Sequence, residues 1–152
     1  MRVPTYFLSV FIILILLVNC SNQKHNKNYE DEFRKLQKQF DLEFSDEESF
    51  LILIPITGCS SCIQPVLEFI QRNRNFKNVT CIISDIGTKR IDSYLKDTIK
   101  TGLRLIPDYN AELYGIDFYL DSPVVYNIKK GRCIGGVILN SQNAQEILSE
   151  MK

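Results

Sequence analysis

The sequence predicts an α/β fold, in which strands and helices alternate along the chain. Residues 50–56 form an unbroken apolar run without the alternation of a half-exposed strand, as expected for a strand covered on both faces. Apolar residues at helical spacing follow this run. The same order then repeats, because the strand-like segment Val79–Ser84 precedes Ile91, Leu95 and Ile99. This strand–helix–strand–helix order predicts parallel strands joined by right-handed crossovers.

An amphipathic helix is expected ahead of the first strand. Tyr29, Phe33, Leu36 and Phe40 recur at the spacing of one helical face, which predicts a helix over Tyr29–Phe40. This face could dock on a partner, but we expect it to pack on the sheet of its own domain.

The C-terminal part of the chain predicts a hairpin followed by a helix. Residues 123–128 and 133–139 have strand character, and the turn Lys129-Lys130-Gly131-Arg132 separates them. Gly135-Gly136 indicates a bulge or a close backbone contact in the second strand. Ser141 is expected to cap the last helix. In residues 101–121 the only predicted element is a short helix near residues 111–114.

The N-terminal residues predict export. Residues 6–18 are almost purely apolar, which is short for a membrane span but typical of a signal peptide. The following Asn19-Cys20 resembles the end of a bacterial lipoprotein signal, although Asn19 departs from the usual small residue. We therefore expect a signal peptide over residues 1–19, a lipidated tether over residues 20–28 that begins at Cys20, and a domain over residues 29–152. An uncleaved signal anchor is the alternative.

Charge and histidine content exclude several kinds of function. Lysine and arginine balance aspartate and glutamate, 18 against 18, so nothing indicates a nucleic-acid partner. The only histidine, His25, lies in the polar tether. A peroxidase or hydrolase that uses a histidine base is therefore not expected.

The candidate site is the sequence Cys59-Ser60-Ser61-Cys62, at the junction of the first strand and the next helix. Free N–H groups at the start of a helix favour the thiolate, which is the attacking species in disulfide exchange. Cys59, the outer cysteine, is expected to be the nucleophile. Cys62, one turn into the helix, is expected to resolve the mixed disulfide.

Two other interpretations of the cysteine pair are weaker. A zinc site would need two further ligands, and Cys81, Cys133 and His25 are not suitably spaced. A chance pair of buried thiols would not be expected where a strand meets a helix. No metal site is therefore predicted.

The chain resembles the thioredoxin superfamily in three features. These are the strand–GCSSC–helix segment, the pair Ser122-Pro123 that opens the hairpin, and the C-terminal helix. The resemblance implies a three-layer sandwich with a central mixed sheet flanked by helices. It also implies that Pro123 is a cis-proline facing the dithiol and that Ser122 presents its backbone to a substrate chain. The interval from Cys62 to Pro123 looks more like the membrane-tethered TlpA and ResA-type branch, whose members reduce or transfer disulfides.

Three positions depart from the pattern of that superfamily. Gly58 replaces the tryptophan that usually precedes the first cysteine, and Leu53 replaces a buried acid. Pro65 stands where the tethered branch often has a glutamate. Glu68 and Asp85 are possible substitutes for the missing acids. The sheet order of the superfamily would also place Cys81 and Cys133 too far apart for a disulfide.

The first hypothesis is a lipid-anchored thiol–disulfide oxidoreductase of the bacterial envelope, facing the periplasm or the cell exterior. Its expected partners are protein thiols and disulfides, a redox partner, and the membrane that holds its lipid, and it requires no cofactor. The second hypothesis is a redox-inactive binding lipoprotein with the same fold, which the missing tryptophan and acid favour.

Overall fold

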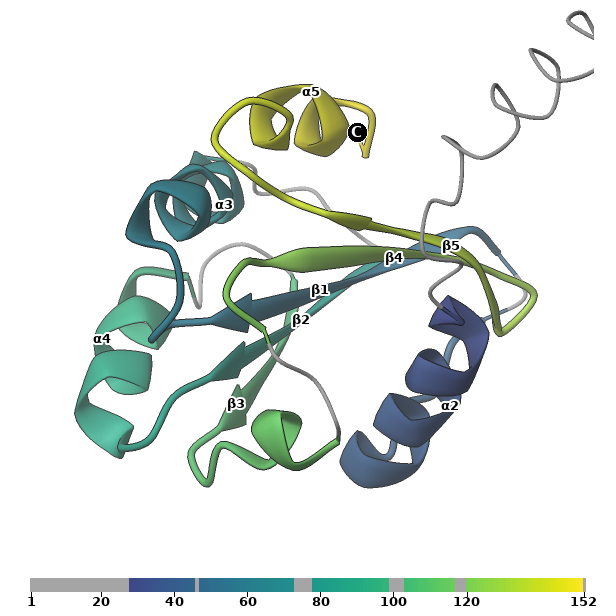
Figure 1. Ribbon diagram of the computed structural model, residues 1–152, viewed down its shortest axis with the longest axis horizontal. Coiled ribbons are helices and arrows are strands. Elements are labelled where there is room, and N and C mark those ends of the chain that lie inside the picture. Colours follow the sequence, from purple (N-terminus) through teal and green to yellow (C-terminus); the bar gives the residue numbers. More distant parts are fainter. Residues whose placement is uncertain (1–27, 46, 73–77, 99–102, 117–119, 152) are drawn as a thin grey trace, which may run out of the picture.

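A five-stranded mixed sheet organises the protein, in the order β3-β2-β1-β4-β5 (Figure 1). The computed structural model describes residues 28–45, 47–72, 78–98, 103–116 and 120–151. The strands are β1 (Ser49–Pro55), β2 (Val79–Ser84), β3 (Arg104–Asp108), β4 (Val124–Lys129) and β5 (Arg132–Ile138). The helices are α2 (Tyr29–Phe40), α3 (Ser60–Arg72), α4 (Thr88–Thr98), α5 (Ala144–Ser149) and the 3-10 helix η2 (Glu112–Gly115).

Strand β1 is the centre of the sheet. It pairs in parallel with β2, with Ile52 opposite Cys81, and antiparallel with β4, with Ile52 opposite Val125. Every residue of β1 except Phe50 is buried. The prediction of a doubly covered strand with parallel and antiparallel neighbours is therefore confirmed.

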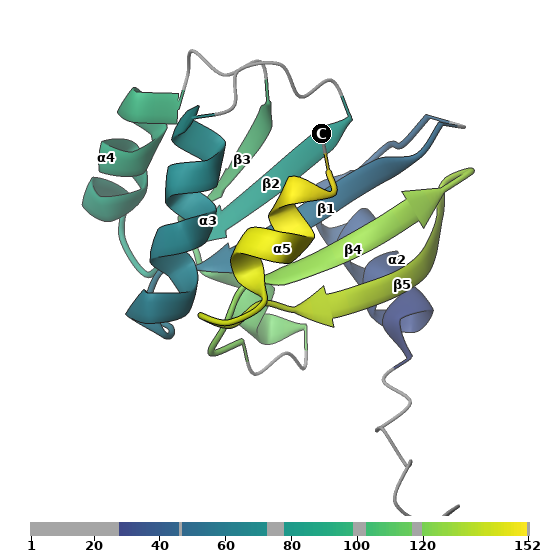
Figure 2. The ribbon, with the colours of Figure 1, turned by 90° about the horizontal axis from the view of Figure 1, so that it is seen from above.

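Helices cover both faces of this sheet, which gives the expected three layers. Ile52 and Ile54 of β1 pack in one core with α3, α4 and α5, whereas Leu51 and Leu53 pack in the other with α2 and η2. Figures 1 and 2 show α3 and α5 together over one face and α2 across the other. The alternation of side chains along a strand explains why consecutive residues belong to opposite cores.

Helix α2 has the predicted bounds and packs on its own sheet. Phe33 and Leu36 are fully buried, and the Phe33 ring lies 6.3 Å from that of Tyr126 on β4. The Asn28 side chain accepts a hydrogen bond from the Asp31 N–H, as a helix N-cap does. The alternative of a docking face does not apply to this apolar stripe, because the domain itself buries it.

Strand β3 was not predicted from the sequence. Its five residues pair in parallel with β2 at one edge of the sheet and include Pro107. An edge strand tolerates a proline because one side of it needs no ladder donors. Sequence reasoning missed the strand because Pro107 and the short apolar pair Leu105-Ile106 resemble a loop.

The hairpin and its irregularity agree with the prediction. Lys130 and Gly131 have φ values of 54° and 69°, and the turn joins β4 to β5. The register shifts near Ile134, because Asn127 pairs with Gly135 while Ile128 pairs with Cys133. A Cβ on Gly136 would lie 2.5 Å from the Tyr29 ring, so this glycine permits the close approach of α2.

The last helix is present, but its predicted cap is wrong. Helix α5 starts at Ala144, and the Asn140 side chain accepts hydrogen bonds from the N–H groups of Gln142 and Asn143. Asn140 thus organises the turn, and Ser141 does not cap the helix. The apolar residues Ala144 and Leu148 of this helix are buried, as is Met151 after it.

The predicted signal peptide, Cys20 and residues 20–27 of the predicted tether lie outside the described residues. Within the described part of the chain, no helix combines the length and apolar character needed to cross a membrane.

Candidate active site: the Cys59–Cys62 disulfide

The turn after β1 brings the two cysteines to the carboxyl end of the strand. The Ile56 N–H donates to the Ser84 carbonyl at 2.9 Å, which continues the pairing with β2. The Gly58 N–H then donates to the Pro55 carbonyl at 3.1 Å and closes a tight turn. Helix α3 begins two residues later, at Ser60. The strand-to-helix position predicted for the dithiol is confirmed.

Cys59 and Cys62 form a disulfide, with their Cα atoms 5.3 Å apart. The Cys59 carbonyl accepts hydrogen bonds from the N–H groups of Cys62 and Ile63, both at 3.0 Å, so Cys59 lies immediately before the first helical turn. Cys59 is partly exposed, whereas Cys62 retains 6% of its accessible surface. Of the two sulfurs, only that of Cys59 is therefore well placed for attack from solvent.

The surroundings of Cys59 favour its thiolate when the disulfide is reduced. The first turn of α3 contains no acidic residue, so nothing there opposes the partial positive charge of the helix start. The Ser61 hydroxyl lies 3.1 Å from the Cys59 sulfur, where it can donate a hydrogen bond to a thiolate. Sequence reasoning did not assign Ser61 this role, although its place between the cysteines was the available signal.

The segment Asp121–Ser122–Pro123 lies directly against the cysteine turn. The Cys59 N–H donates to the Asp121 carbonyl at 2.6 Å. Pro123 is buried and its carbonyl accepts a hydrogen bond from the Leu139 N–H, while Ser122 is half-buried. The structure thus brings the predicted residues Ser122 and Pro123 close to Cys59. Among the described residues no peptide bond is cis, so the expectation of a cis-proline at Pro123 is wrong in this structure.

The contact with Asp121 explains why Gly58 precedes the first cysteine. A Cβ on Gly58 would overlap the Asp121 carbonyl group, with its carbon only 2.8 Å away. Any side chain at this position, including the tryptophan common in the superfamily, would push the two segments apart. Glycine replaces the usual tryptophan at position 58 because the loop before Pro123 packs closely against it.

The two residues proposed as substitutes for the missing acids make other contacts in the structure. Leu53 is fully buried in the core beneath α2. Glu68 interacts with Gln64 and Arg72 along α3. Asp85 is buried, accepts a hydrogen bond from the Ile86 N–H and lies 3.9 Å from Arg90. Neither Glu68 nor Asp85 takes the place of the missing acid.

A further contact supports the turn from the side of η2. The Tyr114 hydroxyl lies 2.6 Å from the Thr57 hydroxyl, two residues before Cys59. Asp108 holds η2 in place, because its buried carboxylate accepts hydrogen bonds from the N–H groups of Glu112 and Leu113. Sequence reasoning missed this support because it depends on the unpredicted strand β3.

Cys81 and Cys133 are free, as expected from their separation in the sheet. Burial raises the pKa of Cys81 to about 12. Burial also raises the pKa of Cys133, and the nearby carboxylates of Glu30 and Glu32 act in the same direction. Among the residues that the structure describes, no group of three or more histidine, cysteine or acidic side chains could hold a metal ion.

Comparisons with known proteins relate the chain to solved structures only. No family model matches the sequence, and a search of curated proteins finds no match. A secreted disulfide oxidoreductase of Mycobacterium tuberculosis, described as homologous to DsbE of E. coli, aligns with a TM-score of 0.53 at 10% identity, covering 71% of this chain and 82% of that one. StoA of Bacillus subtilis aligns at 0.48 and 11% identity, covering 71% and 84%. The exposed lipoprotein thioredoxin Etrx1 of Streptococcus pneumoniae aligns at 0.46 and 14% identity, covering 70% and 87%.

At these identities the likeness concerns the fold, and the alignment with the mycobacterial structure carries it. The sheet order, the helices on both faces and the cysteine turn at the end of β1 agree with that likeness. The chain therefore has the thioredoxin-like fold.

Proposed function

We propose that the protein is a thiol–disulfide oxidoreductase that exchanges its Cys59–Cys62 pair with protein thiols and disulfides. One observation carries the proposal: a disulfide joins a partly exposed Cys59 to a buried Cys62 at the start of α3. A helix start stabilises the leaving or attacking thiolate, and the burial of Cys62 leaves Cys59 as the point of attack.

In the reducing direction, the Cys59 thiolate attacks one sulfur of a client disulfide. A new bond joins Cys59 to that sulfur, and the other client sulfur leaves as a thiolate. Cys62 then loses its proton and attacks the Cys59 sulfur, which forms the Cys59–Cys62 disulfide and releases the second client thiolate. The client gains two electrons and the dithiol loses two. The same steps in reverse oxidise a client dithiol.

Ser122 and Pro123 are the proposed contacts for the client chain. They lie beside Cys59 because the Asp121 carbonyl accepts the Cys59 N–H. The half-buried Ser122 offers backbone groups to an extended client segment next to the reacting sulfur.

We place this activity outside the cytoplasm, on the surface of a membrane. The lipoprotein-type sequence ending at Cys20 supports this location, and so does the chemistry, since disulfides form and persist in oxidising compartments. The lipid on Cys20 would then hold the domain at the bacterial envelope.

A Cys62→Ser variant tests the exchange. Its Cys59 can form a mixed disulfide but nothing resolves it, so client adducts should accumulate on a non-reducing gel of envelope proteins. A variant that also carries Cys59→Ser is the matched control and should show none. Mass measurement of the N-terminal peptide tests the location, because a lipid on Cys20 changes its mass.

Leu53, which stands where the superfamily often buries an acid, favours a second candidate, a redox-inactive lipoprotein that binds client segments on the same fold. That candidate predicts no adducts from Cys62→Ser and a Cys59 thiol as reactive as a free cysteine. Adducts through Cys59 would exclude it.

A further inference from the structure

Positive charge gathers at the turn between β4 and β5. Lys129, Lys130 and Arg132 are all exposed there, and the Arg132 side chain keeps 73% of its accessible surface. Among the described residues, neither lysine has an ion-pair partner. We call residues 129–134 the hairpin tip.

The hairpin tip also presents an apolar side chain to solvent. Ile134 is 59% exposed, and it lies at the register shift of β5, where it has no partner on β4. Cations next to an exposed apolar residue are the features that bind the interface of an anionic bilayer.

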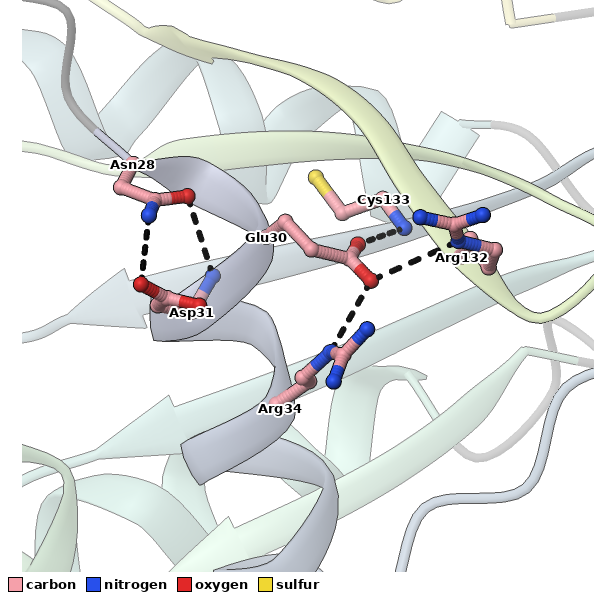
Figure 3. Close-up of polar contacts among 6 residues, drawn as sticks. All are labelled: Asn28, Glu30, Asp31, Arg34, Arg132 and Cys133. Carbon is pink, nitrogen blue, oxygen red and sulfur yellow. Dashed lines mark hydrogen bonds and ion pairs between the residues drawn. The ribbon is translucent and has the colours of Figure 1, made fainter.

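The chain enters the domain beside this tip. Glu30, in the first turn of α2, accepts a hydrogen bond from the Cys133 N–H at 2.8 Å and lies 3.7 Å from Arg132. Figure 3 shows the Glu30 carboxylate between Arg34, Arg132 and the backbone of Cys133. The segment that follows Cys20 therefore joins the domain next to the hairpin tip, and only residues 21–28 separate the two.

The disulfide lies at the opposite end of the sheet. Ser49, the first residue of β1, pairs with Ile128 next to the hairpin, whereas the cysteines follow the last residue of β1. Figure 2 shows the β4–β5 turn at one end of β1 and the start of α3 at the other. Contact with a membrane at the hairpin tip would leave the disulfide pointing away from it.

Acidic residues also lie near this end, among them Glu30, Asp31 and Glu32 in the first turn of α2. Glu30 is shared with Arg34 and Arg132, and Glu48 accepts a hydrogen bond from Asn127 one strand further inward. Glu47 precedes β1 in the sequence. The three exposed cations lie at the end of β4, in the turn and at the start of β5.

We propose that the hairpin tip docks on anionic lipid headgroups of the membrane that holds the Cys20 lipid, and thereby directs the Cys59–Cys62 disulfide toward clients away from the bilayer. The proposal rests on the lipid anchor of the proposed function. It adds a second membrane contact, which would fix the orientation of the domain relative to the bilayer.

Lysine footprinting of the full-length, lipid-bearing protein tests this orientation. The protein is placed on vesicles of phosphatidylcholine alone or mixed with phosphatidylglycerol, and a water-soluble acylating reagent is added. Lys89, exposed at the start of α4 near the disulfide end, is the internal control. We expect Lys129 and Lys130 to react roughly fivefold more slowly on the anionic vesicles, with Lys89 unchanged and the protection lost at high salt.

An Ile134→Ser variant should lose part of this protection while its disulfide is still reduced by dithiothreitol at the wild-type rate, which shows an intact fold. Equal reactivity of Lys129 and Lys130 on both kinds of vesicle would overturn the docking proposal, as would equal protection of Lys89. Protection that persists in detergent and grows with protein concentration would indicate a second copy of the chain and would also overturn it.

The two proposals fail separately. Absence of adducts from Cys62→Ser, with the lysines protected, would reject the exchange activity and leave the docking in place. Adducts without lysine protection would do the reverse. A Cys20 without lipid would overturn the docking together with the proposed location.

Discussion

The two cysteines at the turn after β1 form a disulfide, whereas the two cysteines within the sheet are free thiols. Cys59 and Cys62 lie where β1 meets α3 and are joined in a disulfide. Cys81, in the middle of β2, is fully buried, and Cys133, on the edge strand β5, is half-buried, and both are free. We therefore expect reactivity to depend on the element that carries the sulfur, since a helix start favours the thiolate and a covered strand disfavours it.

The largest expected contrast is in alkylation of the reduced, folded protein. A pKa of about 12, against the ordinary 9.0, lowers the thiolate fraction of Cys81 at pH 8 roughly 1000-fold. Cys59 should react first, Cys133 more slowly than a free thiol, and Cys81 only after unfolding. Mass spectrometry of the labelled peptides measures the three rates. If Cys81 were labelled as fast as Cys133 in the folded protein, the expected order of reactivity would be wrong.

The next contrast is between two glycines. Gly58→Ala would force its Cβ into the Asp121 carbonyl group, and overpacking against backbone costs about 1–3 kcal/mol. It should also slow disulfide exchange, because the Cys59 N–H would lose its acceptor. Gly135→Ala is the control, since a Cβ there meets no atom within 4 Å. Chemical unfolding measures both changes, and equal stability of the two variants would contradict the close packing at Asp121.

The carboxylate next to Cys133 gives a pH test. Burial raises the pKa of Glu30, but hydrogen bonds from Arg34 and the Cys133 N–H, with the charges of Arg34 and Arg132, outweigh it and lower that pKa. A lowered pKa in the folded state stabilises the protein above the unfolded value near 4.5, and this stability is lost as the pH falls through the folded pKa.

Glu30→Gln should therefore lower the free energy of unfolding at pH 7 by about 1 kcal/mol and flatten its fall on acidification. Glu68→Gln, which removes an exposed i,i+4 pair, should change it by less than about 0.5 kcal/mol. Unfolding curves between neutral and acid pH measure both. If the free energy of unfolding of Glu30→Gln fell on acidification as steeply as that of the wild type, the contact of α2 with β5 would contribute no pH-dependent stability.

The smallest effect concerns the hydroxyl beside the nucleophile. Ser61→Ala removes the group 3.1 Å from the Cys59 sulfur, and a lost hydrogen bond of about 1 kcal/mol corresponds to a roughly fivefold slower reaction of the reduced Cys59. Ser60→Ala, in the same turn, should leave the rate unchanged. Equal rates in both variants would show that the helix start alone activates Cys59.

Apolar periodicity identified the elements that each bury a face of their own. The bounds of α2 and β2 agree with the predicted ones, and β1, β4 and β5 differ from them by one residue at each end. Strand β3 was not predicted because its sequence is short and has no clear strand pattern. It is a strand because it pairs with β2. Ser141 was wrongly chosen as a cap because Asn140, one residue earlier, offers a better acceptor to the turn.

The sequence by itself determined the class of fold and the place of the dithiol, because local patterns decide where a buried strand ends and a helix begins. Only the tertiary structure decided what surrounds the sulfurs. The Asp121 carbonyl at the Cys59 N–H, the need for glycine at position 58 and the Tyr114–Thr57 contact all depend on segments far apart in the chain. Such contacts depend on the packing of β4 and η2 against the turn, which no local pattern specifies.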